Sequence, residues 1–232
     1  MEFPSKEILI FKKNILNFYK SLKISYLNNE HNLFSHVEDV ISSLEDDLDF
    51  NIEHKPNIQP VCRFLDVCIS ETKNNDLKKI SETINSLKHF LNWRLNDNYK
   101  NIFEDDFFKN ESFVEIIGPS GLLICDKIRV GLLLLGDNVL YPSHNHQALE
   151  FYTILSGSSM WQINDDNFIL KKPGDKIFHD EWVTHAMKTN GEPVLAPVSY
   201  THLRAHETGR NGGCRRGLGK KKGGGGGGGG GG

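Results

Sequence analysis

The stretch 141–157, YPSHNHQALEFYTILSG, holds four side chains whose types and spacing suit metal chemistry. These are His144, His146, Glu150 and Tyr152, at spacings of two, four and two residues. Side chains at even spacing along an extended chain point the same way, so strands here would aim two imidazoles, a carboxylate and a phenol into one cavity. The odd positions Leu149, Phe151 and Leu155 would face the opposite way and need an apolar layer to cover them. Such a converging set is what a divalent transition metal requires.

A further metal ligand is expected from elsewhere in the fold, and His185, in PGDKIFHDEWVTHAMKT, is the obvious donor. Metal-bound imidazoles need hydrogen-bond partners that fix their tautomer. His179 and Asp180 are candidates for that role, and we do not count His179 among the ligands. Alternatively, these histidines and Glu150 are ordinary polar residues on a solvated strand face.

Tyr152 is the candidate catalytic residue because it follows a ligand glutamate by two positions, on the same face. A nearby divalent cation favours the phenolate, so a group with a reference pKa of about 10 could act as a base near neutral pH. The alternative is an aromatic cavity wall whose hydroxyl finds a hydrogen bond.

The pattern HxHxxxE, a glycine turn, PGD and a late histidine resembles the metal-binding motifs of the cupin superfamily. The finer wording, with a tyrosine two residues after the glutamate and the ending HDEWVTHAMKT, resembles the cupin-type dimethylsulfoniopropionate (DMSP) lyases over roughly 112–196. The resemblance implies a small antiparallel β-barrel with one divalent ion, either zinc, iron, manganese, cobalt or nickel, in its mouth. It implies a carbon–sulfur lyase in which Tyr152 removes the proton α to the substrate carboxylate, and a β-elimination releases dimethyl sulfide and acrylate.

Several residues near these motifs are predicted to wall a substrate pocket. Tyr141 precedes His144 by an odd number of residues, so we expect it to point away from the metal. The expected wall residues are Tyr141, Trp161, His179, Trp182 and Met187. Because sites are reused for different substrates, two other functions stay open: a cupin isomerase, dioxygenase or lyase acting on another small carboxylate, and a cupin that binds a ligand without catalysis.

The second half of the chain reads as short strands separated by turns. The expected strands are SFVEIIG, LLICDKI, RVGLLLL, VLYP, SSMWQIN, FILKK, KIF and THAMK, with PVLA beginning a closing strand. Short strands punctuated by glycine, asparagine and aspartate turns predict a barrel or jelly roll. The fold class expected is therefore mainly β, a cupin barrel preceded by a helical region.

The first half is expected to be helical. The chain therefore divides into a helical region with an aromatic linker, 1–110, and a barrel, 111–197. Apolar residues recur every three or four positions. The predicted helices span 5–28, 33–48, 60–70 and 77–91, and an irregular linker follows over 92–110. We expect the helices to cover the barrel and to bury the surface of a homodimer.

Residues 198–232 are predicted to be an artefactual tail. VSYTHLRAHET resembles a translated sequencing adaptor, and the chain ends in a run of ten glycines. On this interpretation the closing strand is cut short at 197, which would expose a sheet edge.

Composition excludes several classes of partner. The tail holds seven of the 27 basic groups and one of the 30 acidic groups, so residues 1–197 carry 20 and 29, a net charge of −9. An acidic chain without a basic stripe is a poor binder of nucleic acid or of anionic membranes. The three cysteines of residues 1–197 have no paired spacing, and there is no long apolar run, so we expect a cytoplasmic protein in a reducing compartment. The family resemblance implies that its substrate is a small zwitterion.

Overall fold

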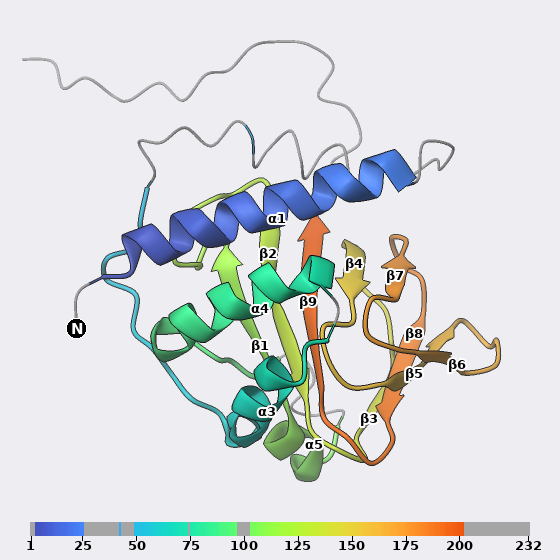
Figure 1. Ribbon diagram of the computed structural model, residues 1–232. Coiled ribbons are helices and arrows are strands. Elements are labelled where there is room, and N and C mark those ends of the chain that lie inside the picture. Colours follow the sequence, from blue (N-terminus) through green and yellow to red (C-terminus); the bar gives the residue numbers. More distant parts are fainter. Residues whose placement is uncertain (1–2, 26–41, 43–48, 74, 97–102, 202–232) are drawn as a thin grey trace, which may run out of the picture.

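The computed structural model describes residues 3–25, 42, 49–73, 75–96 and 103–201. Its centre is a pair of antiparallel sheets (Figure 1). The five-stranded sheet has the order β1-β2-β9-β4-β7, and the four-stranded sheet has the order β3-β8-β5-β6. The strands are β1 Glu111–Ile117, β2 Arg129–Leu135, β3 Leu140–His144, β4 Leu149–Thr153, β5 Ser159–Ile163, β6 Ile169–Lys171, β7 Lys176–His179, β8 His185–Thr189 and β9 Val194–Thr201. From β2 to β9 the chain crosses to the other sheet at every step except β5 to β6, in the manner of a jelly roll, so the expected fold class is confirmed.

β4 shows why two sheets and a helical layer are needed. All five of its residues are buried. Leu149 and Phe151 belong to a core cluster shared with the helices, whereas Tyr152 belongs to a second cluster between the two sheets. Because side chains alternate along a strand, one face of β4 packs under the helices and the other faces the barrel interior.

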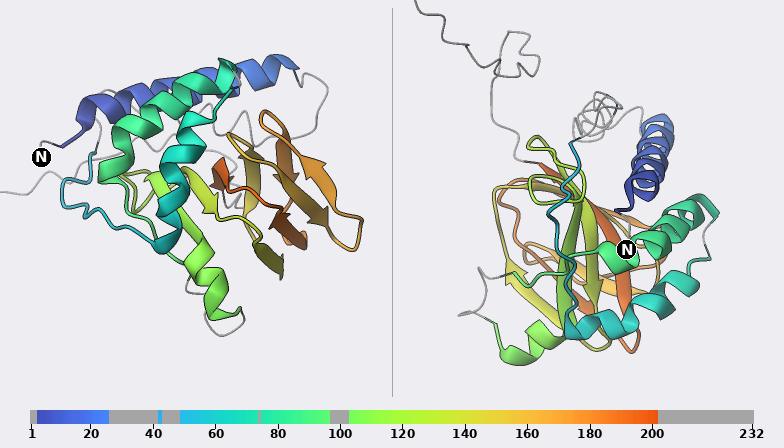
Figure 2. Two further views of the ribbon diagram at one scale, coloured as in Figure 1. Left: turned by 60° about the horizontal axis from the view of Figure 1, so that its bottom comes forward. Right: turned by 90° about the vertical axis from the view of Figure 1, so that its left-hand side faces the viewer.

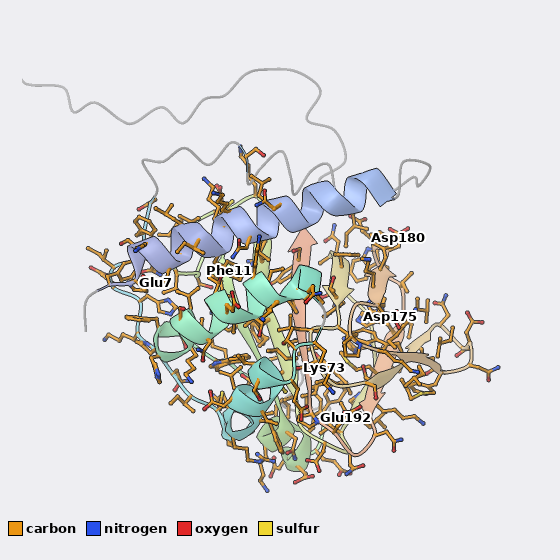
Figure 3. The ribbon with its side chains drawn as sticks, viewed as in Figure 1. Glu7, Phe11, Lys73, Asp175, Asp180 and Glu192 are labelled. Atoms are coloured by element: carbon orange, nitrogen blue, oxygen red, sulfur yellow. The ribbon has the colours of Figure 1, made fainter. Side chains whose placement is uncertain are left out.

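The helices cover the outer face of the five-stranded sheet (Figures 1 and 2). They are α1 Ser5–Ser25, the 3₁₀ segment η1 Pro60–Phe64, α3 Leu65–Ser70, α4 Asn75–Leu87, η2 Lys88–Phe90 and the short α5 Asp105–Asn110. Ile8, Phe11 and Ile15 form the buried stripe of α1, and Phe11 is on the side of α1 that faces α4 (Figure 3). The Asn14 amide also donates to the Thr83 hydroxyl at 2.9 Å, which joins α1 to α4.

The expected helices over 5–28, 60–70 and 77–91 are present with shifted ends, and the one predicted over 33–48 lies outside the described residues except for residue 42. Two local predictions are wrong. The segment LLICDKI, expected as a strand, makes only isolated bridges through Leu123, to Phe50 and Ile117. Its apolar residues Leu122, Leu123, Cys125 and Ile128 are nevertheless buried, so they pack as an irregular loop. The linker, expected to be irregular throughout, contains α5.

β9 extends past the expected boundary at 197. It runs to Thr201 and lies between β2 and β4, pairing Tyr200 with Arg129 on one side and with Glu150 on the other. Residues 198–201, expected in the tail, therefore complete an inner strand of the larger sheet. Residues 202–232 lie outside the described part of the chain.

Candidate metal centre and active-site cavity

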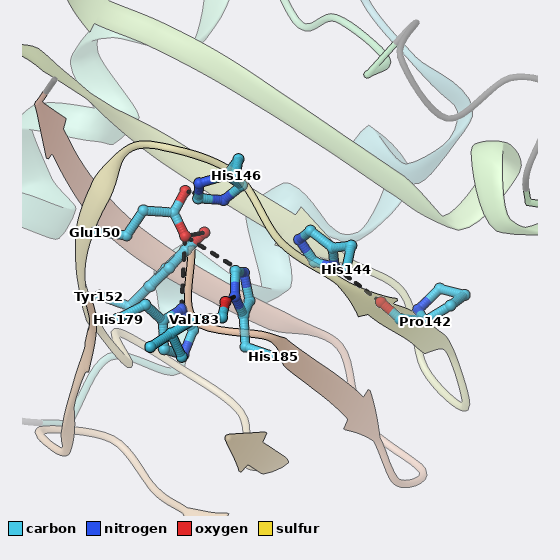
Figure 4. A network of polar contacts seen from close by, with 8 residues as sticks. All are labelled: Pro142, His144, His146, Glu150, Tyr152, His179, Val183 and His185. Atoms are coloured by element: carbon cyan, nitrogen blue, oxygen red, sulfur yellow. Dashed lines mark hydrogen bonds and ion pairs between the residues drawn. The ribbon is translucent and has the colours of Figure 1, made fainter. Parts of the chain in front are cut away.

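The cluster of titratable side chains lies between the two sheets, which each contribute one strand pair. On the smaller sheet, His144 of β3 faces His185 of β8 as a register partner. On the larger sheet, Glu150 of β4 faces His179 of β7 in the same way. His146 comes from the segment between β3 and β4. The structure thus brings together all four predicted ligands and adds His179 (Figure 4).

Glu150 is the centre of this cluster. One carboxylate oxygen lies 3.3 Å from His146 Nε2. The other lies 3.5 Å from His179 Nδ1 and 3.6 Å from His185 Nε2, and it accepts a hydrogen bond from the Tyr152 hydroxyl at 3.0 Å. The even spacing seen in the sequence therefore does place Glu150 and Tyr152 side by side.

Backbone carbonyls orient two of the imidazoles. His144 Nδ1 lies 2.8 Å from the Pro142 carbonyl oxygen, and His185 Nδ1 lies 2.9 Å from that of Val183. A carbonyl oxygen only accepts, so each Nδ1 carries the proton and, in the neutral ring, each Nε2 carries the lone pair. This tautomer is the one a metal ligand needs.

Burial and neighbouring charge set the ionisation of the cluster. Burial alone would raise the pKa of Glu150, but hydrogen bonds and charge from the histidines, His146 foremost, hold it below its usual range. Burial, together with His179 and His144, lowers the pKa of His185 to about 3. Burial also lowers the pKa of His144. Burial lowers the pKa of His146, but its contact with the Glu150 carboxylate outweighs this and raises that pKa overall. An ionised carboxylate beside the neutral rings of His144 and His185 suits cation binding, and His146 must give up its proton before it can act as a ligand.

The donor set fits a divalent transition metal ion. The candidate ligand atoms of His144, His146 and His185 lie within 4.8 Å of one another, as do those of Glu150, His179 and His185. Several of their buried nitrogens have no hydrogen-bond partner: His146 Nδ1, both ring nitrogens of His179, and His185 Nε2. Buried polar atoms without partners are unfavourable, and an ion among them would relieve this. His179, which the sequence analysis left out of the ligand set, therefore has the position of a candidate ligand.

Tyr152 is in its protonated form in this arrangement. The side chain is 7% exposed, and its ring lies 5.1 Å from that of Trp161. Burial, followed by the negative charge of Glu150, raises its pKa well above the usual value. Without a bound metal ion or substrate, the phenol therefore donates its hydrogen bond to Glu150.

A cavity of about 340 Å³ opens onto this cluster. Tyr141, His144, His146, Glu150 and Tyr152 line one part of it. The sequence analysis missed polar residues that line the rest, namely Asn96, Glu111, Glu115, Arg129 and Tyr200. A signal for two of them exists, because Glu111 and Glu115 are four residues apart, a spacing that puts both on one face of a strand.

The predicted wall residues divide into three groups. Tyr141, expected to point away, lines the cavity and stacks on the His144 ring at 4.5 Å. The cause is a bulge: β3 uses three steps from Tyr141 to His144 where β8 uses two from Met187 to His185, which breaks the alternation. Trp161, His179 and Met187 are buried beside the cluster and do not line the cavity.

Trp182 was wrongly predicted as a wall residue. It is 61% exposed and does not line the cavity. Its φ of 60° places it in a left-handed turn, and its backbone N–H donates to the His146 carbonyl at 2.8 Å. The turn carries the indole outward, so the backbone rather than the side chain touches the site.

The architecture and the site can now be compared with those of known proteins. A jelly roll with buried histidines and a glutamate in its mouth is the arrangement of a cupin with a candidate metal site. The profile of the dimethylsulfoniopropionate (DMSP) lyase family matches residues 34–196, so the chain belongs to this family. The resemblance drawn from the sequence is therefore confirmed.

Individual relatives are more distant. Dimethylsulfoniopropionate lyase DddQ of Ruegeria pomeroyi is 29% identical over 93 residues, which cover 40% of this chain and about half (46%) of that protein. The crystal structure of DMSP lyase DddQ from the same organism superposes with a TM-score of 0.64 at 21% identity, over 85% of this chain and 94% of that one. A structure titled as DMSP lyases RdDddP and RnDddQII gives a TM-score of 0.65 at 18% identity, over 85% and 93%. These structures share the fold. Among the described residues, no helix is both long and apolar enough to cross a membrane.

Proposed function

We propose that the protein is a carbon–sulfur lyase that cleaves DMSP to dimethyl sulfide and acrylate. The observation that carries this proposal is the hydrogen bond from the Tyr152 hydroxyl to Glu150 inside a buried cluster of imidazoles. It places a phenol within the cavity, beside the groups that would hold a metal ion and a substrate carboxylate. Family membership supports the substrate class. Cytoplasmic location and a homodimeric assembly stay predictions from the sequence.

His144, His146, Glu150 and His185 would hold the metal ion, with His179 next to them. When bound, a divalent ion would polarise the substrate carboxylate and favour the phenolate of Tyr152 by its positive charge. The choice among zinc, iron, manganese, cobalt and nickel is left open by this donor set.

In the proposed reaction, the Tyr152 phenol first loses its proton to water, and the phenolate then accepts the proton from the carbon α to the substrate carboxylate. The electrons of that C–H bond form the double bond of acrylate while the carbon–sulfur bond breaks, and dimethyl sulfide leaves with the bonding pair. The sulfonium loses its positive charge in this step, which makes it a good leaving group. Glu150 accepts the Tyr152 hydrogen bond and so keeps the phenol oxygen directed at the cavity. A group so placed contributes about 10²–10⁴-fold to a rate.

Two variants separate the base from the metal site. We expect Tyr152→Phe to keep its metal content and to lose about 10²–10⁴-fold in kcat. We expect His146→Ala to lose both metal and turnover. Dimethyl sulfide is measured by gas chromatography and metal by elemental analysis of the same samples.

Three outcomes would contradict the proposal. Full turnover in Tyr152→Phe, with none in His146→Ala, would mean that another group is the base. No dimethyl sulfide with any of the five metals would remove the substrate claim. Oxygen consumption by the iron-loaded protein would favour another cupin enzyme acting on a different carboxylate.

A further inference from the structure

Glu111 is a buried carboxyl group that nothing in the proposed reaction uses. It is the first residue of β1, directly after α5, and it lines the same cavity as the histidine cluster. Its side chain is 1% exposed, and within the part of the chain that the structure describes neither carboxylate oxygen has a hydrogen-bond partner. A buried carboxylate without a partner is strongly unfavourable, so this position calls for a ligand or a proton.

The other two carboxylates of the cavity are already occupied. Glu150 is surrounded by the imidazoles and Tyr152. Glu115 accepts from Arg129 Nε at 3.0 Å and from the backbone N–H of Ser120 at 2.6 Å. Glu111 has no such neighbours among the described residues, and burial raises its pKa to about 8, so it holds a proton near neutral pH until an entering cation displaces it. Among the carboxylates that line this cavity, it is therefore the one left for a cation from solution.

The surroundings of Glu111 suit a soft cation. Aromatic and apolar side chains, among them Phe113, Leu133 and Tyr141, line the cavity with it. Phe107 extends this wall, with its ring 4.9 Å from that of Tyr141. A sulfonium or quaternary ammonium carries its charge beneath methyl groups and donates no N–H or O–H hydrogen bond. Aromatic faces and an unpaired carboxylate attract such an ion, whereas an ammonium would need hydrogen-bond acceptors around it.

We propose that Glu111 binds the onium end of the substrate while the histidine cluster receives its carboxylate. Glu111 thereby selects compounds that carry a carboxylate and a permanent cation on one short chain. The inference rests on the proposed lyase function for the identity of the sulfonium compound. The recognition of an onium group by Glu111 is tested without turnover.

A matched pair of ligands isolates the positive charge. 3-(Trimethylammonio)propionate and 4,4-dimethylpentanoate have the same shape and the same carboxylate, and differ by nitrogen in place of carbon. We expect the metal-loaded full chain to bind the cationic compound on the order of tenfold more tightly, as measured by calorimetry. Glu111→Gln, which keeps the size of the side chain, should bring this ratio close to one and leave the affinity for 4,4-dimethylpentanoate unchanged.

Glu82→Gln is the control, because it makes the same change of charge at an exposed position on α4 and should keep the ratio. Glu111→Leu is the second variant. It replaces the carboxyl group by an apolar group suited to the pocket and should also lose the preference for the cationic compound. It therefore provides the test if Glu111→Gln fails to fold. Equal binding of the two compounds by the wild-type protein, or an unchanged ratio in both Glu111 variants, would overturn the proposal.

The outcome is separable from that of the lyase reaction. A tenfold preference for the cation, lost in Glu111→Gln, supports the role of Glu111 even when no dimethyl sulfide is released. Release of dimethyl sulfide with the same kcat/KM in wild type and Glu111→Gln supports the lyase and contradicts the role of Glu111.

Discussion

The two ends of the cavity each hold a buried carboxyl group, and the two groups are in opposite states. Glu150 is 8% exposed and Glu111 is 1% exposed. Burial acts to raise the pKa of Glu150, but hydrogen bonds and charge from the histidines, His146 foremost, hold it below its usual range. The pKa of Glu111 is raised to about 8 because nothing offsets its burial. Burial is common to both, so the partners decide which carboxyl is ionised.

The difference follows from how each end is built. At the Glu150 end, strands from both sheets converge, and register pairs such as Glu150 with His179 bring polar side chains together. At the Glu111 end, β1 meets α5 and the aromatic cluster that includes Phe107 and Tyr141. On our proposals, the Glu150 side suits a divalent transition metal ion held by the protein, and the Glu111 side suits a cation that arrives with the ligand.

Removing the charge of Glu150 should have the largest effect. We expect Glu150→Gln to lose its bound metal and at least about 10³-fold in kcat/KM, since the carboxylate is both a candidate ligand and the acceptor of the Tyr152 hydrogen bond. Metal content after gel filtration and dimethyl sulfide release are the two measurements. Retention of stoichiometric metal by this variant would show that the imidazoles suffice, and would remove the contrast between the two ends.

Glu111 should make the free energy of unfolding depend on pH. Its folded pKa of about 8 lies above the ordinary value of 4.5, so between these values the folded protein holds a proton that the unfolded chain has released. The free energy of unfolding should therefore fall as pH rises through this window. Each unit of pKa difference corresponds to about 1.4 kcal/mol, so the expected fall exceeds about 1 kcal/mol.

Urea unfolding of the metal-free protein at several pH values checks this. Glu111→Gln should remove the fall, and the difference between the two proteins cancels the titration of the histidines, which is common to both. Parallel pH profiles for wild type and variant would mean that Glu111 has a partner in solution.

The sequence predicted the polar end of the cavity because that end follows simple alternation. Even spacing sets Glu150 and Tyr152 on one face of β4, and the opposite face, with Leu149 and Phe151, is covered as expected. The helices over 5–28 and 77–91 were also predictable, since their apolar residues recur at helical spacing on one buried face.

Features that depend on tertiary context were not predictable. The bulge on β3 places Tyr141 in the cavity, although regular alternation of side chains along the strand would point it away. His179 joined the cluster because β7 pairs with β4, and no local pattern specifies that pairing. Residues 198–201 are part of β9 because β2 pairs with them on one side and β4 on the other, although their sequence resembles an adaptor. In each case, a partner strand decides what the local sequence leaves open.

Trp182 gives the smallest expected effect and tests the boundary of the cavity. Its side chain is 61% exposed, and its contribution to the site is a backbone N–H that donates to His146. Trp182→Ala keeps that N–H, so we expect less than about 0.5 kcal/mol change in the free energy of unfolding and less than about twofold change in kcat/KM.

Trp161→Ala is the matched comparison, because the same residue type is 3% exposed there and packs against Tyr152. We expect that variant to lose about 3–5 kcal/mol of stability, as other large core aromatics do when they are truncated. A tenfold loss of kcat/KM in Trp182→Ala, with unchanged stability, would mean that the indole closes over bound substrate. The cavity would then have a third wall beyond its polar and apolar ends, and the two-ended description of it would be incomplete.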